Sequence, residues 1–282
     1  MADSADSDWK TLDLGGNRHL VRGKHGMYLT NANDIYIGRS LLKYGEFSDH
    51  EIQLMAALVR PGDVVIEVGA HLGSFTVPLA KAVGPKGRVF AFEPQASLHQ
   101  VLCGNLALNR LANTEPRNEA VGEEPGSLKV PVLDYDKENN FGGLGFAEPF
   151  QNGREVPVVT LDAAFADLQK LRLIKIDAEG MEQSILRGGK ELIGKHKPAI
   201  YLEDDRPAAH AGLIDFLLGE LSYRAFWHIP PMFNPDNHFG DSENLFGNTR
   251  SLNLICVPEE ADVNFGNLTE VQKGDKHPLE GK

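Results

Sequence analysis

The stretch Val64-Val-Ile-Glu-Val-Gly-Ala-His-Leu-Gly-Ser-Phe-Thr76 decides the fold of this chain. Its first five residues are mostly β-branched, which predicts a buried strand, and a helix is expected to open at Ser74. Gly69 and Gly73 fall in the turn between the two elements, where a missing side chain lets the backbone come close to a ligand. A strand, a glycine turn and a helix in this order are typical of the first βαβ unit of a nucleoside-binding sheet.

The residues at positions 71 and 93 narrow the choice of nucleoside. A dinucleotide fingerprint, G-x-G-x-x-G, has glycine where this chain has His71, so that a pyrophosphate can sit on the helix N-terminus. About 20 residues after Gly73, an apolar strand over 88–92 ends in Glu93, which is suited to accept hydrogen bonds from two ribose hydroxyls. We therefore expect an adenosine ligand without phosphates, and S-adenosylmethionine is the first candidate cofactor.

The composition is that of a globular protein with an acidic balance. The chain has 282 residues, of which 41% are hydrophobic and 24% are charged, and these fractions are ordinary for globular domains. Its formal charge of −12, from 40 acidic and 28 basic residues, would repel a polyanion. We therefore expect no nucleic-acid partner, while a homo-oligomer is compatible with the sequence.

Neither a membrane span nor a disulfide is expected. The start of the chain, Met1–Asp8, is acidic and polar, and no apolar run reaches the roughly 20 residues that span a bilayer. Cys103 and Cys256 fall in apolar patterns, which favours two buried hydrophobic side chains. The default expectation is a cytoplasmic protein.

Three parts are expected along the chain. Residues 1–48 contain short alternating runs with glycines, which predict an N-terminal extension or cap of small strands. Residues 49–258 alternate strands with helices, and this predicts an α/β fold with a mostly parallel sheet covered by helices on both faces. The last expected strands, 223–228 and 251–257, would form a terminal antiparallel pair. Residues 259–282 are expected to be a polar C-terminal tail.

Acidic residues stand at the ends of four expected strands. Glu67, Glu93, Asp177 and Glu203 would meet at one edge of the sheet, where ligands of open parallel sheets bind. Glu67 and the turn backbone are expected to hold the methionine end of the cofactor, and Asp177 is expected to project over it. The residues expected to contact the cofactor are therefore Glu67, Gly69, Ala70, His71, Gly73, Ser74, Glu93 and Asp177.

Four motifs follow one another along the chain: Pro61–Gly73, Phe92-Glu-Pro94, Asn105-Leu-Ala-Leu-Asn109, and Ile174–Glu182 with Leu186-Arg-Gly-Gly189. In this order and spacing they resemble those of the FkbM family of S-adenosylmethionine-dependent methyltransferases. The resemblance implies a Rossmann-like class I methyltransferase fold with a seven-stranded sheet, and methylation of hydroxyl oxygens on sugars, glycans or natural products. The chain departs from the family at His71, where Asn is frequent, and at Glu67, where Asp is common; both replacements stay polar.

The expected chemistry is an in-line methyl transfer from a cofactor that is already activated. The protein must then align the acceptor and remove its proton. Asp177 is the first candidate for the base or for an acceptor anchor, and His228, at the end of another strand, is the second. Asp177, Glu203 and Asp204 are an alternative Mg²⁺ site, since Mg²⁺ takes oxygen ligands. We nevertheless expect no metal, because an acidic rim often stays metal-free.

Two irregular segments, 123–151 and 230–248, are too long to be simple connectors and are expected to shape the acceptor pocket. Their amides, aromatic rings and glycines suit a sugar. For Glu179 the alternative role is to complement the dipole of the helix that follows it. The residues expected to bind the acceptor are Asn140, Phe141, Glu179, Glu203 and Trp227.

Three other functions stay open at this point. Methylation of a nitrogen on a peptide side chain or a small molecule is compatible with the same cofactor site. An NAD-dependent oxidoreductase is opposed by His71 and by the terminal strand pair. A non-catalytic adenosine-binding module would keep the glycine turn without needing a base.

Overall fold

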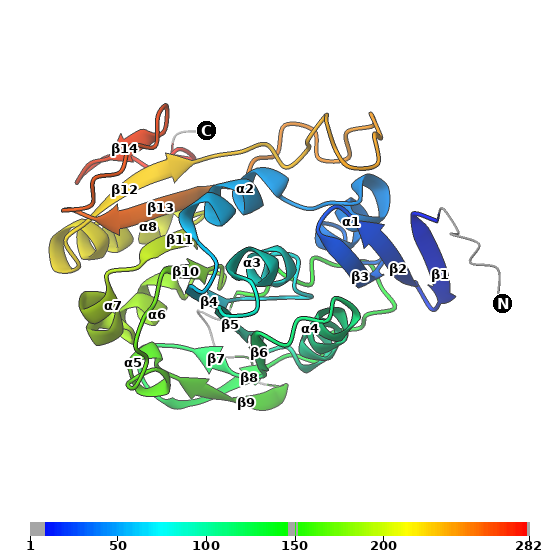
Figure 1. Ribbon diagram of the computed structural model, residues 1–282, viewed down its shortest axis with the longest axis horizontal. Helices are drawn as coiled ribbons and strands as arrows, with labels where there is room; N and C mark the ends of the chain where they lie inside the picture. Colours follow the sequence, from blue (N-terminus) through cyan, green and yellow to red (C-terminus); the bar gives the residue numbers. More distant parts are fainter. Residues whose placement is uncertain (1–8, 146–149, 151, 281–282) are drawn as a thin grey trace.

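The computed structural model describes residues 9–145, 150 and 152–280; residues 1–8, 146–149, 151 and 281–282 lie outside this description. Within the described residues, eight strands form one central sheet (Figure 1). In spatial order they are β14 (Thr269–Val271), β12 (Tyr223–His228), β13 (Asn253–Pro258), β11 (Ala199–Glu203), β10 (Leu173–Ile176), β4 (Val64–Val68), β5 (Arg88–Phe92) and β6 (Thr114–Arg117).

The sheet has the Rossmann-like order of a class I methyltransferase. The five strands from β11 to β6 are parallel, β13 runs antiparallel between β11 and β12, and β4 lies near the centre. The expected terminal antiparallel pair is therefore confirmed as β12 and β13. The eighth strand, β14, adds antiparallel to β12 within the segment expected to be a polar tail. Three residues are too few to show the alternation that predicts a strand.

Helices cover both faces of the sheet, and β4 is therefore buried on both sides. Val65 packs on one face beneath α2 and α3, whereas Ile66 and Val68 pack on the other beneath α5 to α8, as the alternation of side chains in a strand requires. The helices are α1 (Ile37–Tyr44), α2 (Asp49–Leu58), α3 (Thr76–Val83), α4 (Ala96–Leu108), α5 (Leu161–Ala164), α6 (Glu182–Arg187), α7 (Lys190–His196) and α8 (Pro207–Asp215), which continues as a π-helical turn, Phe216–Glu220.

None of the helices in the described part of the chain is both long enough and apolar enough to cross a bilayer.

Two small sheets flank the central one. The first holds β1 (Thr11–Gly15), β2 (Arg18–Gly23) and β3 (Gly26–Asn31), and the second holds β7 (Ala120–Val121), β9 (Arg154–Val159) and β8 (Gly126–Val130). The third strand of the central sheet is β6, an edge strand that tolerates Pro116, while residues 120–121 pair with β9 instead. The segment expected to be irregular from residue 123 contains β8.

Two asparagines of α4 join the N-terminal sheet to the main domain. Asn105 is fully buried; its Oδ1 accepts from Leu29 N at 2.6 Å, and its Nδ2 donates to Leu29 O at 3.1 Å and Leu72 O at 2.8 Å. One helical turn later, Asn109 accepts from Met27 N at 3.0 Å and donates to Met27 O at 2.7 Å. The two amides therefore pair with the free edge of β3 as another strand would, which gives the Asn105–Asn109 motif a structural role.

We expect Asn105→Ala to lower the free energy of unfolding by about 2–4 kcal/mol, because it leaves buried backbone groups of Leu29 and Leu72 without partners. Leu108→Ala on the same helix is the control: Leu108 is exposed, and its loss should cost under about 1 kcal/mol. Denaturant unfolding curves measure both. Equal effects of the two substitutions would contradict the anchoring role.

Candidate functional site

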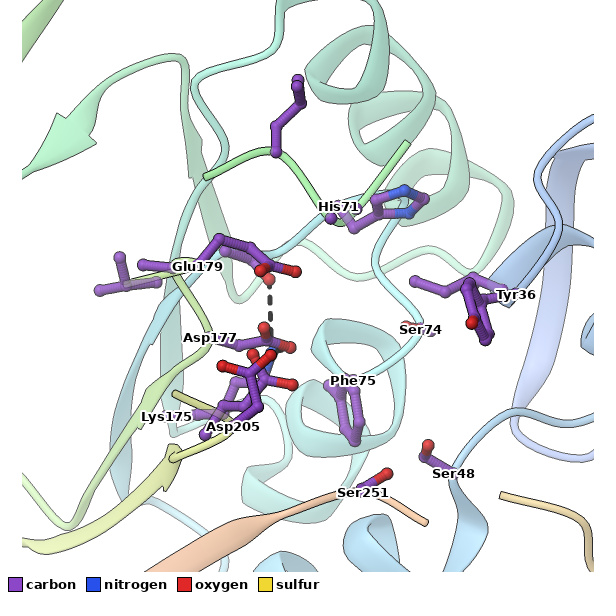
Figure 2. Close-up of a pocket in the computed structure, with 18 of the residues that line it drawn as sticks. Tyr36, Ser48, His71, Ser74, Phe75, Lys175, Asp177, Glu179, Asp205 and Ser251 are labelled. Carbon is purple, nitrogen blue, oxygen red and sulfur yellow. Dashed lines mark hydrogen bonds and ion pairs between the residues drawn. The ribbon is translucent and has the colours of Figure 1, made fainter. Parts of the chain in front are cut away.

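A cavity of about 320 Å³ opens beyond the carboxyl ends of the parallel strands, where open α/β sheets bind ligands. Its walls come from the loops that follow β4, β5, β6, β10 and β11, and from the segment 249–253. The N-terminal part of the chain adds Tyr36, Phe47, Ser48 and Glu51. Figure 2 shows Asp177 and Glu179 on one side of this space, with Tyr36, Ser48, His71 and Phe75 on the other.

The glycine turn forms part of the cavity wall and also touches the neighbouring strand. Gly69 has a φ of +83°, and its N–H donates to Phe92 O at 3.0 Å. A Cβ atom on Gly69 would collide with the carbonyl oxygen of Asp177. The contact between the ends of β4 and β10 therefore requires glycine at position 69, whether or not a ligand binds there.

Glu93 is fixed by the same turn. Its Oε2 accepts from His71 N and its Oε1 from Gln95 N, both at 2.8 Å, and its side chain lies at the cavity wall with 4% exposed. Burial raises the pKa of Glu93 to about 7, although the two backbone N–H groups oppose the rise. Each oxygen keeps a lone pair for a further donor.

His71 is buried and neutral. Burial lowers the pKa of its imidazole, and Asp34 opposes that shift from 3.6 Å, the distance between His71 Nε2 and Asp34 Oδ2. The residue has a positive φ of 51°. Among the described residues, neither ring nitrogen has a hydrogen-bond partner.

Lys175 lies at the centre of the site although it belongs to the buried strand β10. Its Nζ is 3.1 Å from Asp177 Oδ2 and 3.3 Å from Gly69 O, and it lies 4.6 Å from the centre of the Phe75 ring. Burial opposes its charge, but Asp177 and Glu67 outweigh burial and raise the pKa of Lys175. The ammonium group is therefore held charged inside the protein.

Glu67 lies beside Lys175 in register on β4. Its carboxyl is fully buried and accepts from Thr76 Oγ1 at 2.7 Å, at the start of α3. Burial raises the pKa of Glu67 to about 7, with Lys175 and the Thr76 hydroxyl opposing the rise. Glu67 does not line the cavity. Its bond from Thr76 joins the end of β4 to the start of α3 and so stabilises the turn between them.

Three carboxylates converge where β10 and β11 end. One oxygen each from Asp177, Glu179 and Glu203 lies within 4.8 Å of the other two. Burial first, and then Asp177, raises the pKa of Glu179 to about 7, although Arg206 Nη2 lies 2.7 Å from its Oε2. Burial and the neighbouring acids raise the pKa of Glu203 well above its usual range.

The expected site residues fall into two groups. Those that line the cavity are Gly69, His71, Ser74, Glu93, Asn140, Asp177, Glu179 and Glu203. Ala70 and Gly73 belong to the turn without lining the cavity, and Phe141 is buried against Tyr135, with its carbonyl oxygen accepting from Gln95 Nε2 at 2.7 Å.

Three expected positions point elsewhere. Asp204 lies 2.6 Å from His210 Nδ1 and is replaced by Glu179 in the acidic group, because successive residues of an extended chain point to opposite sides. Trp227 is buried in contact with the rings of His210 and His277. His228 does not line the cavity; it contacts the Tyr201 hydroxyl at 2.8 Å, and burial lowers its pKa to about 4.

Three residues that line the cavity were not predicted from the sequence: Glu51, Glu119 and Lys175. Burial raises the pKa of Glu51, and the hydroxyls of Ser251 and Tyr201 oppose the rise. Glu119 Oε2 is buried without a hydrogen bond in the described structure. The signal available for Lys175 was a charged residue inside a buried strand pattern. Glu119 follows β6, an edge strand whose sequence, Thr-Glu-Pro-Arg, lacks the apolar pattern that predicts a strand.

We expect Gly69→Ala to destabilise the protein by at least 2 kcal/mol more than Gly274→Ala, roughly the cost of a backbone clash in a packed region. Gly274 has a similar φ of +86° but open space around it, so it isolates the collision from the cost of positive φ. Thermal or denaturant unfolding checks the difference. Equal losses would show that the contact with Asp177 is unimportant.

Comparison with known proteins adds a family. The family model described as a methyltransferase FkbM domain matches residues 67–225. Over 143 residues the chain is 23% identical to methyltransferase 1 of Beauveria bassiana, covering 44% of this chain and 57% of that protein. Over 66 residues it is 39% identical to the tRNA(Phe) (4-demethylwyosine(37)-C(7)) aminocarboxypropyltransferase of Methanocaldococcus jannaschii, covering 23% of this chain and 26% of that protein. The chain thus spans about a quarter to somewhat over half of these relatives' lengths.

Solved structures of similar shape include an FkbM methyltransferase from Methylobacillus flagellatus, with a TM-score of 0.46, 18% identity, and coverage of 73% of this chain and 50% of that one. Another is TYW2 of M. jannaschii in complex with AdoMet, with a TM-score of 0.45, 14% identity, and coverage of 87% of both chains.

Proposed function

The chain belongs to the FkbM family of methyltransferases, and from this premise we propose that it binds S-adenosylmethionine in the cavity and methylates an acceptor hydroxyl. The observation that carries the proposal is Glu93, whose carboxylate is held at the cavity wall by the backbone of the glycine turn. A carboxylate fixed in this way is suited to the two ribose hydroxyls of an adenosine ligand. The bound sulfonium would supply an activated methyl group.

The two ends of the cofactor would contact different walls. Glu119 follows β6, and its buried Oε2, which lies 3.9 Å from Arg117 Nη1 and accepts no hydrogen bond from a described residue, would face the exocyclic amine of an adenine. Gly69, Ser74 and Asp177 would contact the methionine end, whose ammonium group suits the carboxylate of Asp177. Lys175 fixes the orientation of Asp177 and keeps the end of β10 against the turn.

Proton removal from the acceptor falls to the acidic group. Asp177 is held by Lys175, with 39% of its side chain exposed, so it can orient a hydroxyl from the cavity wall. Glu179, with a pKa of about 7, is basic enough to share a proton with an acceptor near neutral pH. Neutral His228 does not line the cavity, which makes it the weaker candidate.

The acceptor proposed first is a sugar, a glycan or a natural product. Asn140 and the backbone of Gly142 and Gly143 line the cavity and provide the amide donors and acceptors that hydroxyl groups require. The second candidate is an amine on a peptide or a small molecule. The excess of carboxylates along the wall favours it, because they would attract a cationic acceptor before its deprotonation.

We expect the affinity for S-adenosylmethionine to fall about tenfold from pH 8 to pH 6, since the ionised Glu93 accepts from the ribose and its pKa is about 7. Below that pKa the free protein holds a proton that the ligand must displace. Glu93→Gln should bind more weakly at pH 8 and lose most of this pH dependence, whereas the half-exposed control Glu115→Gln should behave as wild type. Titration calorimetry at both pH values measures this. Tight binding of NAD with none of S-adenosylmethionine would overturn the proposed function.

We expect Asp177→Asn to lose about 10²- to 10⁴-fold in turnover at saturating cofactor, the usual contribution of a positioned acid–base group. The assay is release of S-adenosylhomocysteine in a screen of hydroxyl and amine acceptors. Undiminished turnover would remove Asp177 from the reaction. If only amine acceptors were methylated, the proposed acceptor would be an amine instead of a hydroxyl.

A further inference from the structure

One cluster at the cavity wall is incompletely neutralised by the protein. Asp177, Glu179 and Glu203 bring one oxygen each to within 4.8 Å of the other two. Two of these carboxylates have cationic neighbours: Asp177 lies 3.1 Å from Lys175 and Glu179 lies 2.7 Å from Arg206. The third, Glu203, makes no ion pair in the described part of the chain within 4.0 Å.

Both cationic side chains are shared with other acids. Arg206 Nε also lies 3.5 Å from Asp205 Oδ1. Lys175 faces the buried Glu67 as well as Asp177. Each cation therefore already lies beside two acidic side chains and does not neutralise Glu203.

Glu203 has a carboxylate oxygen without a hydrogen-bond partner among the described residues. This atom, Oε2, is buried. The residue lines the cavity, so its carboxyl lies at the cavity wall, although Oε2 itself is out of contact with solvent. An unpaired carboxylate in such a place is costly, and a bound cation or a proton must compensate it.

We propose that Asp177, Glu179 and Glu203 bind one divalent metal ion at the wall of the cavity. The donor set consists of carboxylate oxygens alone, which suits hard cations such as Mg²⁺, Mn²⁺ and Ca²⁺. Ligands at about 2.1–2.5 Å from a metal lie up to roughly 4–5 Å apart across it. The observed spacing therefore allows all three oxygens to reach one ion with small side-chain movements.

No metal was expected from the sequence, and the alternative Mg²⁺ site there combined Asp177 and Glu203 with Asp204. In the structure Asp204 is engaged by His210. Glu179 takes its place because Glu179 and Gly180, with φ of +51° and +97°, form the turn after β10 that leaves Glu179 beside Asp177.

A metal at this place would select acceptors by their oxygens. Its free coordination positions would face the cavity, where a metal-bound hydroxyl has a lowered pKa. An acceptor with two neighbouring oxygens, such as a vicinal diol, would occupy two positions at once. This role rests on the proposed methyl transfer, whereas the existence of the site does not.

The test is a titration of the full chain with Mn²⁺. The electron paramagnetic resonance signal of the free ion measures how much Mn²⁺ stays unbound. We expect one Mn²⁺ per chain, displaced by excess Mg²⁺, and at least about tenfold weaker binding in Glu203→Gln. Glu179→Gln, with a more accessible side chain, should weaken it as well, and it provides a second test if Glu203→Gln does not fold. Glu220→Gln is the matched control, because Glu220 pairs with Lys190 on the surface, away from the cavity.

Absence of Mn²⁺ binding, or equal binding by the control and both site variants, would overturn the proposal and assign the compensation of Glu203 to a proton. Cofactor affinity is measured separately on the same samples. A chain that binds Mn²⁺ at this site but not S-adenosylmethionine would keep the metal site and lose the proposed function. A chain that binds S-adenosylmethionine but not Mn²⁺ would lose the metal site and keep the proposed function.

Discussion

The buried ammonium group of Lys175 is the interaction on which the rest of the site depends. It bonds to Gly69 O and Asp177 Oδ2 and so joins the ends of β4 and β10. It also supplies the positive charge between Glu67 and Asp177. Without it the fully buried carboxyl of Glu67 would lose its cationic neighbour, and burying an uncompensated ion costs several kcal/mol. The glycine turn, Glu93 behind it and the acidic group before it all take their positions from this junction.

The N-terminal part of the chain completes the site from the opposite direction. Asn105 and Asn109 fix β3 to α4, and the segment after β3 carries Asp34 to within 3.6 Å of His71. Tyr36, Ser48 and Glu51 follow along the chain and line the cavity. The cap thus contributes walls to a pocket whose floor is the central sheet, and stability at the α4–β3 contact is linked to the shape of the site.

Sequence patterns predicted those features that depend on local order. The position of Glu93 followed from a strand of defined length after a glycine turn, and Asp177 and Glu203 followed from the rule that strand ends share one edge. Patterns failed where the direction of a side chain depends on distant partners. Asp204 turns to His210, Trp227 is enclosed by His210 and a C-terminal histidine, and Glu51 reaches the cavity from a helix in another part of the chain.

The most direct test of the account is a crystal structure of the chain with S-adenosylhomocysteine. We predict that the ribose hydroxyls contact Glu93, with His71 N and Gln95 N still bound to its carboxylate, and that the homocysteine end lies between Gly69 and Asp177 above the Lys175 junction. A ligand bound outside this cavity, or one whose ribose leaves Glu93 uncontacted, would contradict the assignment of the site.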